Sequence, residues 1–184
     1  ELANASRGNH AIDLGPLEEA AKAIALAENT AVFHGYPGAG IRGITEASSH
    51  DHVQASGEWG EFPQAVAVAV ERLLLAGIGG PYGLALGDDA WVGVVEATER
   101  GSTLIGHLST IVNGPIVWAP GAHGGIVVSQ RGGDFTIDSG QDLSIGYSHH
   151  DADTVTLYLE ESFTFRVEEP DAAVALVVPA TGTA

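Results

Sequence analysis

The sequence predicts an α+β fold, in which helices form the first half of the chain and antiparallel strands form the second half. Over residues 17–27, apolar side chains recur at spacings of three and four, which is the spacing of one helix face. Residues 65–70 alternate like a strand, but the length of that segment, its start at Pro63 and its continuation through residues 71–73 favour a helix. From residue 116 onward, β-branched and aromatic residues come in short runs separated by glycines and other turn residues. The 184 residues are enough for one domain with a sizeable core.

Four helices are expected in the first half of the chain. Asp13 is placed to cap the first, whose first turn holds a proline and acidic side chains and whose apolar stripe covers residues 17–27. The second begins at Pro63 and ends at the glycines that follow residue 76. Asp88 and Asp89 are placed to cap the third. The expected helices cover residues 13–27, 63–76, 88–96 and 103–112.

A short buried strand is expected between the second and third helices, and six strands follow the fourth helix. Gly132, Gly133 and Gly140 are expected to form turns with positive φ, since glycine adopts that conformation without steric cost. No repeat of a useful period is visible in the sequence. The expected strands cover residues 82–86, 116–118, 126–130, 135–137, 143–147, 155–167 and 173–178.

Charge and composition exclude several classes of function. The chain has 24 acidic and 7 basic residues, and a net charge of -17 repels nucleic acid and anionic membranes. Neither is therefore expected as a partner. The absence of cysteine excludes disulfides and thiolate metal sites. No apolar run reaches 18 residues, the length needed to span a bilayer as a helix.

Some short motifs contain the residue types of reactive sites, but their context argues against that chemistry. Residues 50–52 and 149–151 each hold two histidines and an aspartate, yet both lie in polar, turn-like segments typical of solvated side chains. Residues 49–51 contain serine, histidine and aspartate, whereas catalytic triads are assembled from distant segments. Residues 38–43 fit G-x-G-x-x-G but follow a helix instead of a strand. No catalytic residue, metal site or cofactor is predicted.

Six blocks of sequence, in the same order, resemble the encapsulins, which are the linocin-type shell proteins of bacterial nanocompartments. Together they cover most of residues 17–178. The blocks are ENTAVFHGYPGAGIRGI (28–44), LLLAGIGGPYGLAL (73–86), HLSTIVNGPIVWAP (107–120), RGGDF (131–135), GQDLSIGY (140–147) and DTVTLYLEESFTF (153–165).

The resemblance implies the Hong Kong 97-type phage major capsid fold, with a peripheral domain over residues 1–79 and 119–184 and an axial domain over 80–118. It also implies a shell subunit that assembles with copies of itself into an icosahedral shell in the bacterial cytoplasm. That shell encloses a cargo enzyme, such as a dye-decolourising peroxidase or a ferritin-like protein, recognised by its C-terminal targeting peptide. Such a chain is not an enzyme and needs no cofactor.

Two functional regions follow from the same resemblance. The loop over residues 96–103 is expected to line a pore at a five-fold axis, where a ring of five copies repeats each side chain. In the family, a groove between the N-terminal helix and strands of the peripheral domain holds the targeting peptide in an extended conformation. Because that helix lies ahead of the segment with which this sequence begins, the chain alone is expected to bind the peptide weakly or not at all. The expected pore-lining residues are Thr98, Glu99, Arg100 and Ser102. The expected peptide-contacting residues are Asp142, Leu143 and Ile145.

One departure from the family concerns the start of the chain. Encapsulins have an N-terminal arm, a helix and an extended loop ahead of a segment like ELANASRG, with which this chain begins. The chain also lacks methionine, so we expect a C-terminal fragment, either cleaved from an N-terminal portion that remains as a separate partner chain or simply truncated. Two other functions are alternatives: the catalytic, bacteriocin or protease activity of a linocin-like protein, and a phage major capsid protein.

Overall fold

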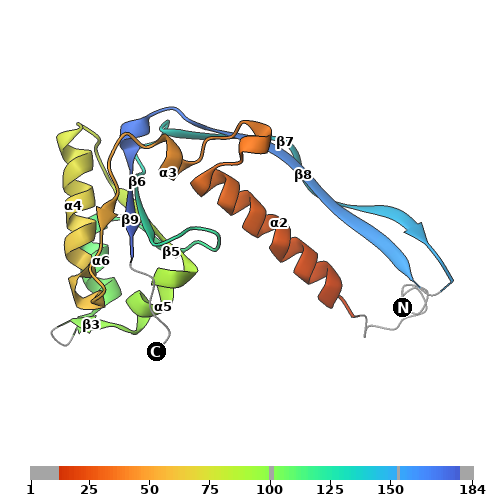
Figure 1. The fold of residues 1–184 in the computed structure, drawn as a ribbon, viewed down its shortest axis with the longest axis horizontal. Helices are drawn as coiled ribbons and strands as arrows, with labels where there is room; N and C mark the ends of the chain where they lie inside the picture. Colours follow the sequence, from red (N-terminus) through yellow and green to blue (C-terminus); the bar gives the residue numbers. More distant parts are fainter. Residues whose placement is uncertain (1–12, 100–101, 153, 179–184) are drawn as a thin grey trace.

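The computed structural model describes residues 13–99, 102–152 and 154–178. The chain forms a compact part, which we call the head, and a long projecting part, which we call the arm (Figure 1). The arm consists of helix α2 (Gly15–His34) and a two-stranded ribbon made of β7 (Phe135–His150) and β8 (Val155–Val167). All other described elements belong to the head. Helices and strands are both present, as the α+β prediction requires.

The head is built on a five-stranded sheet. Its strands are β1 (Val53–Gln54), β2 (Tyr82–Leu86), β5 (Ile116–Trp118), β6 (Gly125–Ser129) and β9 (Ala173–Val177). They lie in the order β1-β9-β6-β2-β5, so that β2 is parallel to β5 on one side and antiparallel to β6 on the other. β9 is antiparallel to β6 and parallel to β1. All five residues of β2 are buried, as expected for a strand covered on both faces.

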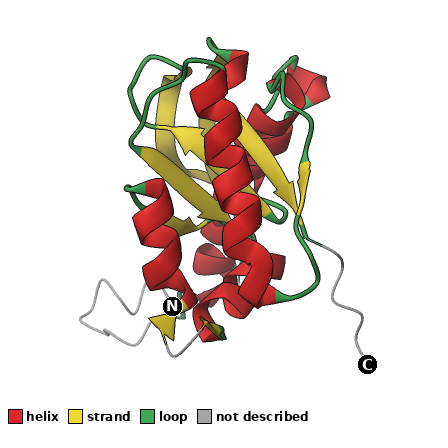
Figure 2. Ribbon diagram, turned by 90° about the vertical axis from the view of Figure 1, so that its left-hand side faces the viewer, coloured by secondary structure: helices red, strands yellow, loops and turns green. Residues whose placement is uncertain are grey.

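Helices cover one face of this sheet (Figure 2). They are α4 (Phe62–Leu75), α5 (Asp88–Glu96) and α6 (Leu104–Val112), with the short α3 (Ile44–Ala47) at the junction with the arm. The side chains of Phe62, Leu73, Leu86 and Leu108 are fully buried between these helices and the sheet. Among the described residues, no helix is both long and apolar enough to cross a bilayer. The remaining elements are η1 (Pro37–Ala39), η2 (Trp59–Glu61), η3 (Pro170–Ala172), β3 (Thr98–Glu99) and β4 (Ser102–Thr103).

The four expected helices are all present, and α2 is longer than expected. It continues to His34 and ends at Gly35, whose φ of 91° is outside the helical range. The Asp13 carboxylate accepts a hydrogen bond from the Gly15 backbone N–H at 2.9 Å, although Leu14 occupies the cap position itself. At α6 the Thr103 hydroxyl accepts from a backbone N–H of the first turn, as a cap residue does.

The expected caps of α5 are wrong. Gly87 occupies the cap position, and Asp88 and Asp89 lie in the first turn of the helix, where negative charge complements the helix dipole. Other groups hold their carboxylates. Asp88 accepts from the Trp118 indole N–H at 2.7 Å, and Asp89 accepts from the Gly124 backbone N–H at 2.9 Å. The start of this helix is therefore bonded to the segment around β5.

The ribbon differs from expectation in its continuity. Residues 135–137 and 143–147 were expected to form two strands with a positive-φ turn at Gly140, but both belong to the single strand β7. Gly140 lies inside this strand at a register shift and is absent from the positive-φ residues, whereas Gly132 and Gly133 have φ of 88° and 84° as expected. The extra residues are accommodated as bulges, for which glycine in a strand is a common signal.

The two strands of the ribbon have unequal lengths. β7 has 16 residues and β8 has 13, yet their ends are paired, Phe135 with Val167 and His150 with Val155. Three register shifts, after Ser139, Gln141 and Tyr147, account for this difference, and each places one additional residue on β7. Because bulges bend a strand and increase its local twist, placing all of them on one strand curves the ribbon in one direction.

The expected division into two domains stays a prediction. The head sheet contains strands from both expected segments. β2 and β5 come from the expected axial segment and pair with each other, and β2 also pairs with β6, which comes from the expected peripheral segment. Helix α4, also from the expected peripheral segment, packs against α6 of the axial one. Segments on the two sides of each boundary therefore share one sheet and one core.

Two leucines in the last turn of α4 provide a test of this packing. Leu73 is fully buried, whereas Leu75 is 82% exposed. Leu73→Ala is expected to lower the free energy of unfolding by about 2–5 kcal/mol, because it removes buried methyl groups and leaves a cavity. Leu75→Ala, the same chemical change, is expected to stay within about 0.5 kcal/mol of the parent. Denaturant titration of the full chain measures both values, and equal losses would contradict the placement of α4.

Candidate functional site

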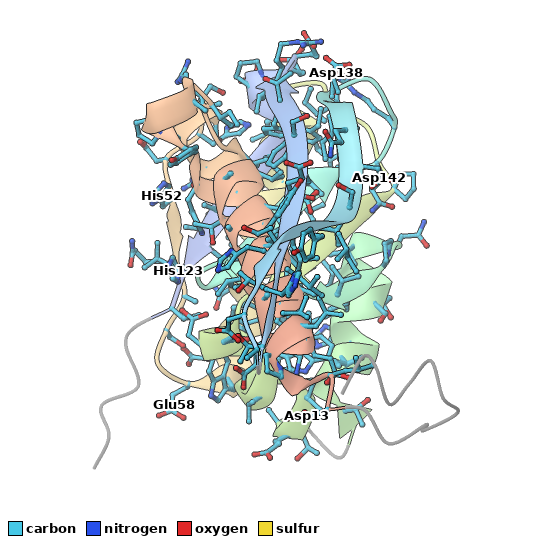
Figure 3. The ribbon with its side chains drawn as sticks, turned by 90° about the vertical axis from the view of Figure 1, so that its right-hand side faces the viewer. Asp13, His52, Glu58, His123, Asp138 and Asp142 are labelled. Atoms are coloured by element: carbon cyan, nitrogen blue, oxygen red, sulfur yellow. The ribbon has the colours of Figure 1, made fainter. Side chains whose placement is uncertain are left out.

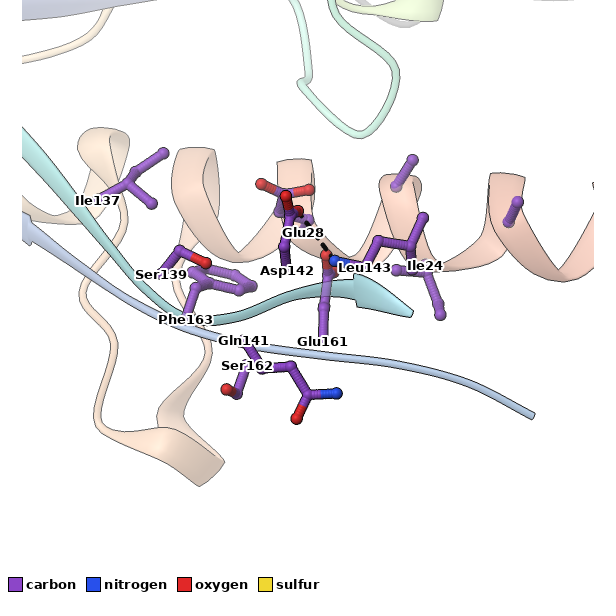
Figure 4. A pocket seen from close by; sticks show the side chains of 12 residues that line it. Ile24, Glu28, Ile137, Ser139, Gln141, Asp142, Leu143, Glu161, Ser162 and Phe163 are labelled. Atoms are coloured by element: carbon purple, nitrogen blue, oxygen red, sulfur yellow. Dashed lines mark hydrogen bonds between the residues drawn. The ribbon is translucent and has the colours of Figure 1, made fainter. Parts of the chain in front are cut away.

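A groove lies between α2 and the ribbon (Figure 4). It encloses a cavity of about 230 Å³. On the helix side, Ala21 and Ala25 leave space because their side chains are short, and Ile24 lies between them. On the ribbon side, the floor is formed by both strands, with Phe163 of β8 as the largest side chain. The groove is therefore an opening between two elements that are distant in sequence.

The alternation of β8 explains which side chains face α2. Successive residues of a strand point to opposite faces, and on β8 the residues Leu159, Phe163 and Phe165 are partly or fully buried. Residues between them, such as Glu160 and Arg166, are exposed. The buried side of this alternation is apolar with one exception. Glu161 lies on it and lines the groove beside Phe163.

The second bulge of β7 shapes the other wall of the groove. The register shift between Gln141 and Ser144 places one extra residue at Asp142 and Leu143. In a regular strand two neighbouring residues point to opposite faces, but here both line the cavity. The Asp142 carboxylate also accepts a hydrogen bond from the Leu143 backbone N–H at 2.9 Å, which holds the bulge locally (Figure 4). The bulge thus presents an acidic and an apolar side chain together.

The three residues expected to contact a peptide are only partly brought together. Asp142 and Leu143 line the groove, whereas Ile145 is not among its lining residues and is 59% exposed farther along β7. Sequence reasoning missed the helix side of the groove and also Glu28 and Glu161. The signal for Glu161 was present, because an acid there interrupts the apolar positions of β8.

The groove is negatively charged. Glu28 of α2, Asp142 of β7 and Glu161 of β8 all line it, and none of the described lining residues is basic. Burial raises the pKa of Glu161, and the nearby carboxylates of Glu28 and Asp142 raise it further. A groove with apolar walls and this charge favours a ligand that combines apolar side chains with a cationic or hydrogen-bond-donating group.

The expected pore residues lie in a short hairpin between α5 and α6. Thr98 of β3 pairs with Thr103 of β4, and Glu99 pairs with Ser102. The Thr98 side chain is exposed. Arg100 lies outside the described residues. The hairpin lies at one end of the head, on the side away from the ribbon (Figure 1).

The serine and histidines of the motifs that contain reactive residue types have other partners or lie at the surface. The Ser49 hydroxyl donates to the Asp171 carboxylate, whereas the His50 ring Nε2 lies 3.0 Å from the Asp171 backbone oxygen, so serine and histidine are not paired. His52 is exposed at the surface (Figure 3). The His150 ring Nδ1 lies 2.5 Å from the Tyr147 hydroxyl oxygen. Within the described ranges, no group of three histidine or carboxylate side chains has a metal-binding arrangement.

Comparison with known proteins identifies the family. The model of the Linocin_M18 family, described as "Encapsulating protein for peroxidase", matches residues 1–164. The chain belongs to this family. The expected resemblance is therefore confirmed.

Curated relatives of this Linocin_M18 chain include proteins named "Type 1 encapsulin shell protein". One from Rhodospirillum rubrum is 45% identical over 177 residues, which are 96% of this chain and 63% of that protein. Another from Mycolicibacterium paratuberculosis is 43% identical over 176 residues, which are 96% of this chain and 66% of that protein. The chain thus spans slightly less than two thirds of the length of these relatives.

Solved structures establish the fold. The crystal structure of a virus-like particle from Pyrococcus furiosus matches with a TM-score of 0.60 and 19% identity, over 81% of this chain and 61% of that one. The capsid structure of the cyanophage P-SCSP1u matches with a TM-score of 0.55 and 12% identity, over 97% of this chain and 69% of that one. At such identities the likeness concerns the fold alone. It confirms the Hong Kong 97-type capsid fold.

The raised pKa of Glu161 leads to a pH-dependent prediction. Because the folded state favours its neutral form, the folded protein loses stability as pH rises above the ordinary glutamate value of 4.5. Glu161→Gln is always neutral and is expected to raise the melting temperature at neutral pH by about 1–3 °C. The gain should vanish below pH 4.5, where the parent carboxyl is also protonated.

The control for this prediction is the next residue along β8. Glu160 is exposed on the other side of the strand, so Glu160→Gln is expected to leave the melting temperature within about 1 °C at all pH values. Thermal unfolding followed by circular dichroism measures both variants. An equal gain in the two variants, or a gain for Glu161→Gln that does not depend on pH, would refute the assignment.

Proposed function

We propose that the chain is part of a shell subunit of an encapsulin nanocompartment, which assembles with copies of itself into a closed icosahedral shell around a cargo enzyme. The observation that carries this proposal is the combination of Linocin_M18 membership with a capsid fold, since relatives over 40% identical are named as shell proteins. The chain acts as a wall, and no residue in it performs chemistry. The compartment lies in the bacterial cytoplasm.

The surface of the arm is suited to contacts between subunits. A ribbon with one apolar side would normally be covered along its length, yet several large apolar side chains near its far end are exposed. Subunits in a closed shell contact one another through unlike surfaces, which lets a single chain type build a curved wall. The exposed large apolar residues of the ribbon are Ile137, Leu143, Ile145, Tyr147, Val155, Leu157 and Tyr158.

The β3–β4 hairpin is proposed to surround a pore at each five-fold axis. The two short strands hold Thr98, Glu99 and Ser102 at one end of the head, and Arg100 follows Glu99 in the sequence. Five copies of each charged side chain around one opening would act together on a passing ion or small substrate. The pore would thereby select what reaches the enclosed enzyme.

The groove between α2 and the ribbon is proposed to bind the C-terminal targeting peptide of the cargo enzyme. An extended peptide lying along β7 would place an apolar side chain against Leu143 and a donor group near Asp142. Ile145, which lies beyond the cavity, would contact the next apolar position of the peptide. A peroxidase or a ferritin-like protein is the expected cargo.

A catalytic role is less favoured by the geometry. The serine and histidine that could have formed part of a triad are bonded to different atoms of Asp171. A phage capsid role is less favoured by charge, because a net charge of -17 opposes the enclosure of nucleic acid.

Electron microscopy of the native material tests the shell directly. We expect closed icosahedral particles in which intact-mass measurement finds this chain. Particles that lack the chain, or native material that contains it only in small species, would overturn the proposal. A phage origin would be indicated by particles filled with nucleic acid, which absorbance at two wavelengths detects.

The peptide groove has a separate test. Leu143→Ala is expected to weaken the binding of the C-terminal tail peptide of the copurifying enzyme to intact shells by about threefold to tenfold, because it removes an apolar contact. Leu75→Ala makes the same change at an exposed position of α4 in the head and should leave the affinity unchanged. Titration by fluorescence anisotropy measures both variants. Equal affinities for the two variants would exclude this groove as the docking site.

A further inference from the structure

Two histidines join the arm to the head. His34 is the last residue of α2, and His123 lies in the loop over residues 119–124, which connects β5 to β6. Their rings are stacked, with centroids 4.9 Å apart and planes inclined by 25°. We call them the histidine pair. None of the reactive motifs in the sequence includes either residue.

The loop that carries His123 is firmly attached to the head. The Gly124 backbone N–H donates to both oxygens of the Asp89 carboxylate, at 2.9 and 3.0 Å, and the Gly87 N–H donates to the Gly124 carbonyl at 2.9 Å. The same loop touches α2. Gly121 is so close to the helix that a Cβ atom there would lie 2.7 Å from the Thr30 hydroxyl oxygen. The loop is therefore a bridge between head and arm.

Hydrogen bonds determine which nitrogen of His34 carries its proton. The Thr45 hydroxyl donates its one hydrogen to the Phe33 carbonyl at 2.9 Å, so it can only accept from the His34 Nδ1, 3.0 Å away. Nδ1 is then protonated, and Nε2 of the neutral ring is a bare acceptor. This Nε2 is buried and has no hydrogen-bond partner in the described part of the chain.

We propose that the histidine pair is a proton-sensitive contact, which holds α2 against the 119–124 loop while the His34 ring is neutral and releases the loop when His34 takes up a proton. The geometry gives two reasons. A proton on the His34 Nε2 would create a buried N–H group without an acceptor, which is unfavourable. A cationic His34 would also face the stacked ring of His123, whose electrostatic effect disfavours the charged form of His34.

The balance of burial and surrounding groups favours this direction. Burial lowers the pKa of His34, and the neighbouring His123 lowers it further, while Asp89 on α5 acts in the opposite direction as a smaller contribution. On the α3 side, the Glu46 carboxylate lies against Gly35, and Arg42 donates to the Glu46 backbone carbonyl. A neutral ring is thus favoured in the closed contact. The contribution of the neutral His34 ring to the stability of the closed contact is complete above about pH 6.5 and is lost as pH falls below that value.

The histidine pair would respond to pH whether or not the chain forms a shell, because it lies entirely within one subunit. Acid would loosen the attachment of α2 to the head, and with it the relative orientation of arm and head. Release of a loop is a local opening, which requires no unfolding of the core.

Hydrogen–deuterium exchange of the full protein at about pH 7.5 and about pH 5.5 tests this proposal, with labelling times scaled to equal intrinsic exchange. Peptides that cover residues 26–35 and 119–125 are expected to exchange about threefold to tenfold faster at the lower pH. Peptides from α4 should show no change and serve as the internal reference. Unchanged protection of both segments at the lower pH would overturn the proposal.

Three variants identify the residues responsible. His34→Asn keeps a donor for Thr45 but does not titrate, so it should abolish the acid response. His123→Phe keeps a ring over His34 but removes the electrostatic effect of His123 on His34, so it should reduce the response. His52→Phe removes an exposed histidine elsewhere and should behave like the parent. An acid response that persists in full in His34→Asn, or one that disappears in His52→Phe, would refute the assignment to the histidine pair.

Discussion

The structure depends on one strand, β2, which is hydrogen-bonded on both edges and buried on both faces. Its parallel partner β5 and its antiparallel partner β6 fix the two ends of the 119–124 loop, which lies against α2 at Gly121. The first turn of α5 follows β2 directly and binds the same region through Asp88 and Asp89. The position of the arm relative to the head is thus set by contacts that begin at β2.

The unequal strands of the ribbon are the second constraint. Three additional residues on β7 must be accommodated while both ends stay paired with β8, and bulges are the way a ladder does this. The bulge at Asp142 and Leu143 lies opposite the alanines of α2, so the extra side chain enters open space instead of a filled core. The groove is therefore a consequence of a length mismatch within the ribbon and of small residues on the helix.

Local patterns in the sequence were enough to predict the helices and most strands. Signals at the helix ends, a proline or threonine at the start and glycine after the end, identified α4 and α6 nearly to the residue, because those signals act within a few residues. Gly140 was assigned to a turn because a glycine in a bulge and a glycine in a turn look alike in sequence, and only the partner strand distinguishes them. Asp142 and Leu143 were found through family resemblance. The histidine pair depends on contacts between distant segments, for which a single sequence carries no signal.

Glu161 connects the packing of the ribbon with the proposed function. An acid on the buried side of β8 is a local inconsistency, since burial and two neighbouring carboxylates disfavour its charge. A phenylalanine, as at the neighbouring position 163, would suit that side of the strand better in the isolated subunit. In natural proteins such inconsistencies concentrate at functional sites. This one lies in the groove lined by Asp142 and Leu143, two residues that the resemblance assigns to the targeting peptide, although Glu161 played no part in that assignment. The two arguments are independent, and their agreement supports a peptide that carries a hydrogen-bond donor near Glu161. That donor would take the place of the water that burial removes from the Glu161 carboxylate.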